Sequence, residues 1–236
     1  MQKMHKGIQS PAVWLEDDEG NGMKVYLSPA QHKNQGACSP GGVRYLEDYW
    51  TRKVANQAAK ILRAAGVTVK VSTNWPTDNF VGAASQSNAW GADVHIPIHS
   101  NAGNGRMRGT DTFYYSTRGK ALAQTLLRYI GAVSGQKRSV TYKTWHELTA
   151  TNAIAAYVEL DFHDNPAGCK HISTNYRLFG KAIAEGVLDH YNVSKPKPKS
   201  TIPLAARSLR KAFLSLPDRW QLWVLKYAPR WHDKGK

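Results

Sequence analysis

Short apolar runs alternate with longer amphipathic segments along most of the chain. The sequence predicts strands at 24–28, 67–72, 93–99, 110–116 and 154–162, and helices at 46–65, 80–90, 118–133 and 176–191. This order is typical of an α/β domain with a central, mostly parallel, twisted sheet and helices on both faces. In such sheets, functional residues gather where strands end and in the loops that follow them.

A short spacer separates this alternating part from the end of the chain. Residues 194–201 read Ser-Lys-Pro-Lys-Pro-Lys-Ser-Thr, which cannot form the interior of a helix and whose like charges favour an extended segment. We therefore expect an N-terminal extension at 1–23, a main domain at 24–193, a Pro/Lys linker at 194–201 and a basic helical appendage at 202–236.

Positive charge is concentrated in that C-terminal appendage and its linker. The chain has 32 Lys and Arg residues against 17 Asp and Glu residues, a net charge of +15. After Ser194, eleven basic residues face only Asp218 and Asp233, a net charge of +9. Such a segment favours an anionic wall polymer or a membrane surface as partner, unless it packs on the main domain as a helical hairpin. No nucleic acid is expected, because no nucleic-acid-binding motif accompanies the charge.

Hydropathy excludes a transmembrane helix. Mean hydropathy is −0.51, and no stretch reaches the roughly 18 apolar residues that a transmembrane helix needs. Lys3 and Lys6 are not followed by an apolar run of about seven residues or more, so we expect no secretory signal peptide.

Glu47 opens the helix predicted at 46–65, on the side that carries its apolar residues. At about 100° per residue, Val54 and Ile61 fall within about 60° of Glu47, whereas Asp48 lies on the opposite side. A carboxylate there is either a helix-end residue that faces the positive end of the helix dipole or a group held inside by a cation.

Two histidines stand where an α/β sheet presents its ligands. His32 lies in the loop after the first predicted strand, and His99 ends the third. A single histidine in a loop is more often a surface residue than a ligand. Together with Glu47, however, these two residues form a ligand set of catalytic zinc, which keeps a fourth position for water.

Glu159 interrupts the apolar run of the strand predicted at 154–162. A buried charge is costly, so such a residue is paired, protonated or functional, unless the strand lies at an edge with Glu159 in solvent. A glutamate beside a metal-bound water can serve as general base and general acid.

In this order, the four residues resemble those of the zinc-dependent N-acetylmuramoyl-L-alanine amidases of the amidase-3 type, found in autolysins and phage endolysins. The resemblance covers about 24–193. It rests on His32, Glu47, His99 within Ile-His-Ser-Asn, and Glu159 within Val-Glu-Leu-Asp-Phe-His-Asp-Asn. The Phe-His-Asp-Asn ending is more similar to phage endolysins. One departure is Gln-His-Lys-Asn around His32, where the family often has Gly-His-Gly-Gly.

The resemblance implies an enzyme that hydrolyses the amide between N-acetylmuramic acid and L-alanine in bacterial peptidoglycan. It implies that His32, Glu47 and His99 hold Zn²⁺ and that Glu159 moves the protons. The enzyme would be made in the bacterial cytoplasm and act on the cell wall after release, as an endolysin or autolysin. Two alternatives stay open: a non-catalytic, basic protein that binds wall or nucleic acid, and a zinc peptidase of the stem peptide.

Five further residues have no assigned role. His146 and His163 are candidates to line the cleft, whereas His95 is expected to serve in packing. Cys38 follows the His32 loop and Cys169 follows the Glu159 strand, so the two could lie close together. Two free thiols are an equally good interpretation for a protein made in a reducing cytosol.

Overall fold

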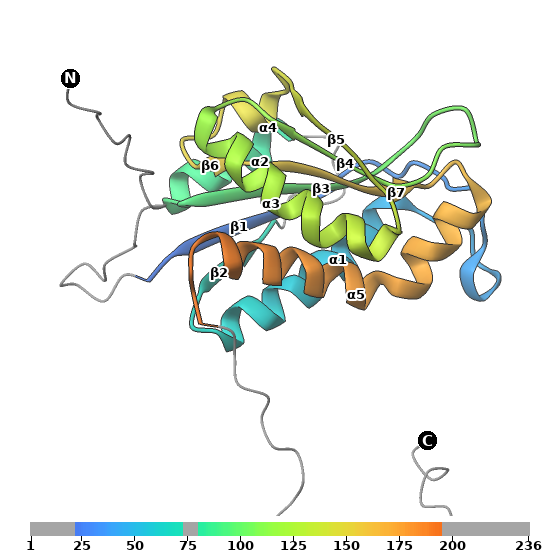
Figure 1. Cartoon of the computed structure of the whole chain (residues 1–236), viewed down its shortest axis with the longest axis horizontal. Coiled ribbons are helices and arrows are strands. Elements are labelled where there is room, and N and C mark those ends of the chain that lie inside the picture. The colour runs from blue at the N-terminus through green and yellow to red at the C-terminus, as the bar shows by residue number, and fades with distance from the viewer. Residues whose placement is uncertain (1–21, 73–79, 195–236) are drawn as a thin grey trace, which may run out of the picture. The chain divides into compact units, whose positions relative to one another are not determined.

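The computed structural model describes residues 22–72 and 80–194 (Figure 1). The predicted N-terminal extension up to residue 21, the linker beyond Ser194 and the predicted helical appendage at 202–236 lie outside the described residues. The division of the chain into these parts therefore stays a prediction.

A seven-stranded sheet forms the centre of the described part (Figure 1). Its strands are β1 (Lys24–Pro29), β2 (Thr68–Val71), β3 (Val94–Asn101), β4 (Thr110–Tyr114), β5 (Lys137–Tyr142), β6 (Ile154–Ala155) and β7 (Tyr157–Phe162). The order is β2-β1-β3-β7-β4-β5, and β6 also pairs with β3. Strands β4 and β7 pair antiparallel and the other described pairs are parallel, which confirms the mostly parallel sheet.

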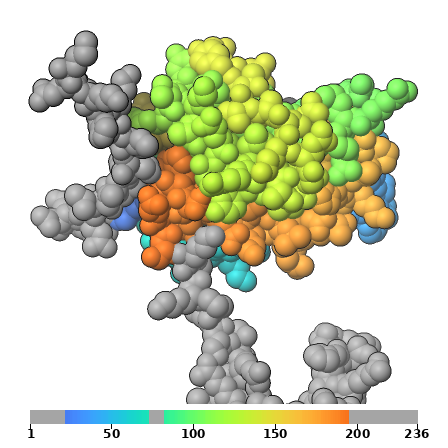
Figure 2. Space-filling view, in the orientation of Figure 1, coloured from blue at the N-terminus to red at the C-terminus, as the bar shows by residue number. Residues whose placement is uncertain are grey.

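Helices cover both faces of this sheet, as predicted. They are α1 (Glu47–Ala64), α2 (Phe80–Trp90), α3 (Thr117–Ser134), α4 (His146–Thr149) and α5 (Pro166–His190), with a 3-10 turn η1 (Pro40–Gly42). Helix α5 packs between α1 and α3, and α3 and α5 cover the side of the molecule shown in Figure 2. No helix in the described ranges is long and apolar enough to cross a membrane.

The sheet face under α1, α3 and α5 is apolar. Successive side chains of a strand point to opposite faces, and in β3 Val94, Ile96 and Ile98 point to this one, fully buried. Leu126 of α3 and Phe179 of α5 belong to the same buried cluster. This face holds most of the hydrophobic core that stabilises the domain.

The other face, under α2 and α4, is polar and aromatic. The hydroxyl of Tyr26 in β1 donates to Oε1 of Gln86 in α2, at 2.8 Å. Leu148 of α4 packs on Phe113 and Tyr157. His99 in β3 points to this face as well, because it alternates with the apolar residues of its strand. The candidate site residues of the strands therefore lie on the face that the apolar core leaves free.

Several predicted elements differ from the observed ones. Helix α5 begins at Pro166 instead of Tyr176, because Asn165 caps it by accepting from the backbone of Ala167 and Gly168, and a kink at Asn175 divides it. The strand predicted at 154–162 is divided into β6 and β7. Strand β5 was not predicted, because its mostly exposed side chains give no apolar alternation, and α4 is only one turn long.

Candidate metal centre and active site

Three side chains from separate elements converge at the ends of β1 and β3. His32 follows β1, Glu47 is the first residue of α1 and His99 belongs to β3. Nε2 of His32 lies 2.9 Å from Oε2 of Glu47, and Nδ1 of His99 lies 3.3 Å from Oε1. One ligand atom from each residue lies within 4.8 Å of the others. The structure thus brings together the three residues that the sequence singled out as a ligand set.

Asn34 fastens the His32 loop to the first turn of α1. Its side-chain amide donates to Oε2 of Glu47 at 3.0 Å, and its carbonyl accepts from the Glu47 backbone at 2.9 Å. An isolated bridge between Gln35 and Leu46 closes the loop. The run that departs from the family's glycines therefore supplies its own hydrogen bonds.

Glu47 is held as a charged carboxylate although it is almost fully buried. Its side chain is 1% exposed, and Oε1 accepts from the backbone of Ser100 at 2.8 Å. Burial alone would raise the pKa of Glu47, but the hydrogen bonds and charges of His32 and His99 lower that pKa well below its usual range. A buried carboxylate whose charge depends on neighbouring donors suits a cation site.

Glu159 lies beside this group in the interior of the sheet. It is the register partner of His99 in β3 and of Asp111 in β4. The edge-strand alternative is therefore wrong, because β7 pairs on both sides. Glu159 is 8% exposed, and its Oε2 is buried without a hydrogen-bond partner among the described residues. Burial, followed by the charges of Glu47 and Asp111, raises the pKa of Glu159 well above its ordinary value.

A cavity of about 370 Å³ joins these residues. Its lining residues are His32, His99, Trp145, His146, Glu147, Tyr157 and Glu159. The ring of Tyr157 stacks on His99 with centroids 4.6 Å apart, and Trp145 lies edge-on to Tyr157 at 4.8 Å. A larger hollow of about 710 Å³ lies between α3 and α5, but no histidine lines it. The smaller cavity is the candidate active site.

The three other histidines that the sequence singled out have different surroundings. His146 lines the cavity, as the sequence allowed. His163 is not among the residues that line it, and its Nδ1 lies 2.7 Å from the carbonyl oxygen and 3.0 Å from the hydroxyl of Ser100. His95 is fully buried, as its predicted packing role requires, and it also contacts the carboxylate of Glu147.

Sequence reasoning missed three residues of the cavity wall. Tyr157 could have been found, because it stands two residues before Glu159 and so shares its face of the strand. Trp145 and Glu147 gave no such signal, since Trp145 caps and Glu147 lies within a helix of a single turn, which is too short to show a helical period.

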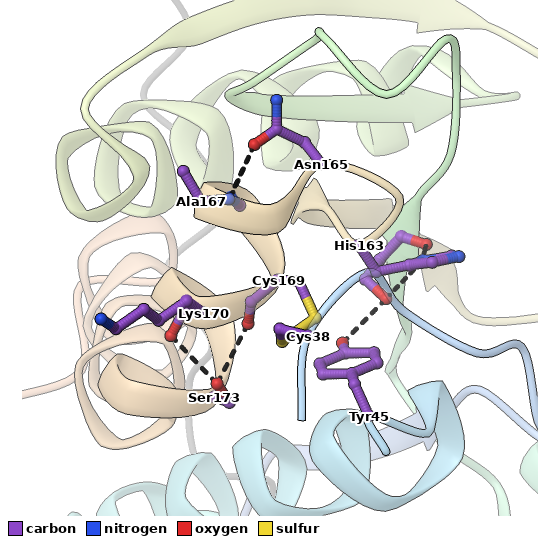
Figure 3. The surroundings of a disulfide bond; sticks show 10 residues. Cys38, Tyr45, His163, Asn165, Ala167, Cys169, Lys170 and Ser173 are labelled. Carbon is purple, nitrogen blue, oxygen red and sulfur yellow. Dashed lines mark hydrogen bonds between the residues drawn. A yellow bond between two sulfur atoms is a disulfide. The ribbon is translucent and has the colours of Figure 1, made fainter. Parts of the chain in front are cut away.

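Cys38 and Cys169 form a disulfide, with Cα atoms 5.8 Å apart (Figure 3). It joins the loop before α1 to the first turns of α5 and lies next to Tyr45. The hydroxyl of Tyr45 donates to Ser100 at 3.0 Å, and Ser100 in turn donates its backbone N–H to Glu47. Of the two interpretations that the sequence left open, the structure shows the paired one.

Comparisons with known proteins identify the family of this chain. The family model described as N-acetylmuramoyl-L-alanine amidase (Amidase_3) matches residues 25–189. A probable cell wall amidase, LytH of Staphylococcus epidermidis, is 26% identical over 189 residues, which cover 78% of this chain and 63% of the relative. The chain thus spans less than two thirds of that relative's length.

Solved structures show the same fold. The catalytic domain of CwlV, an N-acetylmuramoyl-L-alanine amidase from Bacillus (Paenibacillus) polymyxa var. colistinus, is similar with a TM-score of 0.64 at 22% identity, over 73% of this chain and all of that domain. An N-acetylmuramoyl-L-alanine amidase from Clostridium difficile 630 gives 0.64 at 23% identity, over 73% and 98% of the two chains. With the family match over most of its length, this chain belongs to the N-acetylmuramoyl-L-alanine amidase family.

Proposed function

We propose that this protein is a zinc-dependent peptidoglycan amidase that hydrolyses the bond between N-acetylmuramic acid and L-alanine. The observation that carries the proposal is the convergence of His32, Glu47 and His99 at a cavity that His32, His99 and Glu159 line. Family membership and the name of the staphylococcal relative, a probable cell wall amidase, support it. The Phe-His-Asp-Asn run favours a phage endolysin over an autolysin.

The donor set fits a zinc ion. Two imidazole nitrogens and one carboxylate oxygen are a known ligand combination of catalytic zinc, and these atoms lie within 4.8 Å of one another. His32 would bind through Nε2, His99 through Nδ1 and Glu47 through its carboxylate. When bound, zinc polarises the scissile carbonyl and lowers the pKa of water toward about 7.

Glu159 is the residue that we assign to proton transfer. Its pKa is raised by burial and by the charges of Glu47 and Asp111, whereas the pKa of Glu47 is lowered. Two carboxyl groups whose environments shift their pKa values in opposite directions serve different roles. Glu47 stays charged to hold the cation, and Glu159 takes a proton from the attacking water and passes it to the leaving amine.

Product analysis tests this reaction directly. The full-length protein is incubated with purified peptidoglycan, and the products are identified by mass spectrometry. Stem peptides with a free N-terminal L-alanine and intact glycan strands are the expected products. Cleavage within the stem peptide would instead identify a zinc peptidase, and binding without cleavage would identify a non-catalytic wall protein.

We further propose that the basic segment at 202–236 binds an anionic wall polymer or membrane surface. The net charge of +9 after Ser194, which includes the three lysines of the linker, supports this proposal. Synthesis in the bacterial cytoplasm and action on the wall after release are part of the same proposal. Sedimentation with cell walls at rising salt tests it, because screening should weaken the binding.

A further inference from the structure

A second carboxylate faces the cavity, and the proton transfer proposed above does not use it. Glu147 of α4 lines the cavity with His99 and Glu159 and is 4% exposed. It is not part of the group whose ligand atoms could hold a metal. Since a buried carboxylate needs compensating contacts, its surroundings indicate what it does.

A buried histidine holds Glu147 in place. Nε2 of His95 lies 2.9 Å from Oε2 of Glu147, and His95 is fully buried in β3, four residues before His99 and on the same face. The ring of Tyr26 stacks on His95 with centroids 5.3 Å apart. Only a protonated Nε2 can donate to the carboxylate, so we assign the proton to that nitrogen. The contact fixes one oxygen of Glu147.

The one-turn helix that carries Glu147 is fastened at its other end as well. Asn88 of α2 donates to the carbonyl of Ala150 at 2.8 Å and accepts from the backbone of Asn152 at 2.7 Å. Leu148 packs against Phe113 and Tyr157 on the sheet. Contacts from β3 and from α2 therefore hold Glu147 and its helix in place. A one-turn helix that only covered the sheet would not need both sets of contacts.

The second carboxylate oxygen remains available. Among the described residues, hydrogen bonds to Glu147 involve Oε2 only, while the residue lines the cavity. An ionised carboxylate only accepts hydrogen bonds, so Oε1 recognises an N–H or O–H donor. The bond that the proposed reaction breaks is flanked by amide N–H groups and sugar hydroxyls, which are donors of this kind.

We propose that Glu147 is a substrate-binding residue that accepts a hydrogen bond from an amide N–H or hydroxyl of the muramoyl-peptide, and that His95 is its positioning residue. This inference rests on the proposed function, because it takes its substrate class from there. Glu147 acts on binding, and Glu159 acts on the reacting atoms.

The variant Glu147→Gln separates these roles. Its amide oxygen can still accept from His95, but its NH₂ group then faces the substrate donor. With a muramoyl dipeptide that contains the scissile amide, KM should rise about tenfold or more, as expected for a lost hydrogen bond to a charged group. The kcat should stay within about threefold, with zinc content and Tm retained. Asp189→Asn, the same change of charge on α5, is the matched control and should leave KM unaltered.

The positioning role of His95 has its own readout. His95→Gln keeps a side-chain N–H donor, so it should raise KM less than His95→Leu, which removes the donor. An unchanged KM in Glu147→Gln would overturn the inference, as would a loss confined to Tm or zinc content, because that pattern marks a purely structural pair.

Calorimetric binding of the same dipeptide distinguishes the two proposals. If the parent protein binds the dipeptide without cleaving it, the proposed function fails, and the weaker binding expected of Glu147→Gln still supports the role of Glu147. If the parent protein cleaves the dipeptide while Glu147→Gln binds it equally well, the amidase assignment stands and the inference about Glu147 is wrong.

Discussion

The two faces of the sheet bury different kinds of side chain. Under α1, α3 and α5, strand β3 contributes Val94, Ile96 and Ile98 to a continuous aliphatic core. Under α2 and α4, the same strand contributes His95 and His99, which contact carboxylates. Burial of apolar surface stabilises a fold, whereas burial of polar groups costs free energy unless they are paired. The first face therefore accounts for most of the stability and the second for the chemistry, and substitutions on each should separate the two.

The polar face pairs most of its buried charges. Asp161 accepts from Arg108 through both oxygens, and Asp111 accepts from Arg138 and Ser139. Glu159 differs, because its Oε2 has no partner among the described residues. A buried carboxylate oxygen left without a donor next to a possible cation site is the clearest mark of function on this face.

The largest effect on this comparison should come from His99→Ala. This change removes one of the three proposed zinc ligands and leaves the aliphatic core intact, so the protein should remain folded but lose most of its zinc and its activity. Metal analysis and circular dichroism check the two halves of this prediction. Full zinc content in the variant would remove His99 from the site.

Glu159→Gln should lower kcat by about 10²–10⁴-fold while zinc stays bound. The amide has nearly the same shape as the carboxyl group but cannot accept the proton of the attacking water. Steady-state hydrolysis of a soluble muropeptide measures the loss. Activity within threefold of the parent would transfer the role to another group of the cavity, with His146 the next candidate.

The pH dependence of the unfolding free energy of the metal-free protein tests the raised pKa of Glu159, with Glu159→Gln as the comparison. Burial raises the pKa of Glu159 above its ordinary value of 4.5, so ionisation favours the unfolded state. The parent should lose stability as pH rises from about 4.5 toward the folded pKa, and the loss should then level off. Glu159→Gln should lack this decline, so the variant becomes the more stable protein above about pH 4.5. Parallel unfolding curves at all pH values would contradict the raised pKa.

On the apolar face, Leu126→Ala should reduce the free energy of unfolding by about 2–5 kcal/mol. Leu126 is fully buried, and its side chain lies against Gly186 of α5, so its removal leaves a cavity between α3 and α5. Denaturant unfolding measures the change, and Leu178→Ala, at a side chain that is 51% exposed, is the control. The kcat of the folded variant should stay near that of the parent.

The sequence predicts the strands of the sheet except β5, but only part of the site. Glu47 is buried, as its helical position indicates, yet Asp48 is also fully buried although it was placed on the opposite side. Helical periodicity predicts which side of a helix packs against the sheet. It cannot predict burial by a loop such as the His32 loop, which lies over the first turn of α1. Glu147 was missed for a related reason, since its position depends on a contact with His95, 52 residues earlier in the chain.

The disulfide joins the loop before α1 to α5, beside the apolar core, and its loss should cost about 2–4 kcal/mol of unfolding free energy. Cys38 and Cys169 lie 131 residues apart in sequence, so the bond constrains a long loop in the unfolded chain. Activity at room temperature should persist in Cys38→Ser/Cys169→Ser, because Asn34 holds the His32 loop independently. Chemical denaturation with and without reductant checks the parent protein. A loss of zinc on reduction would instead show that the bond positions the site.

The smallest effect should come from the outer surface, where neither face is involved. Arg128 of α3 and Asp189 of α5 form an ion pair whose side chains are 59% and 43% exposed. Water and salt screen such a pair, so Arg128→Gln should change the free energy of unfolding by less than about 1 kcal/mol. A double-mutant cycle with Asp189→Asn isolates the pair, and its coupling should shrink further in high salt. A coupling above about 2 kcal/mol would mean that α3 and α5 are held together by charge as well as by the apolar core beneath them, and the division of roles between the two faces would need revision.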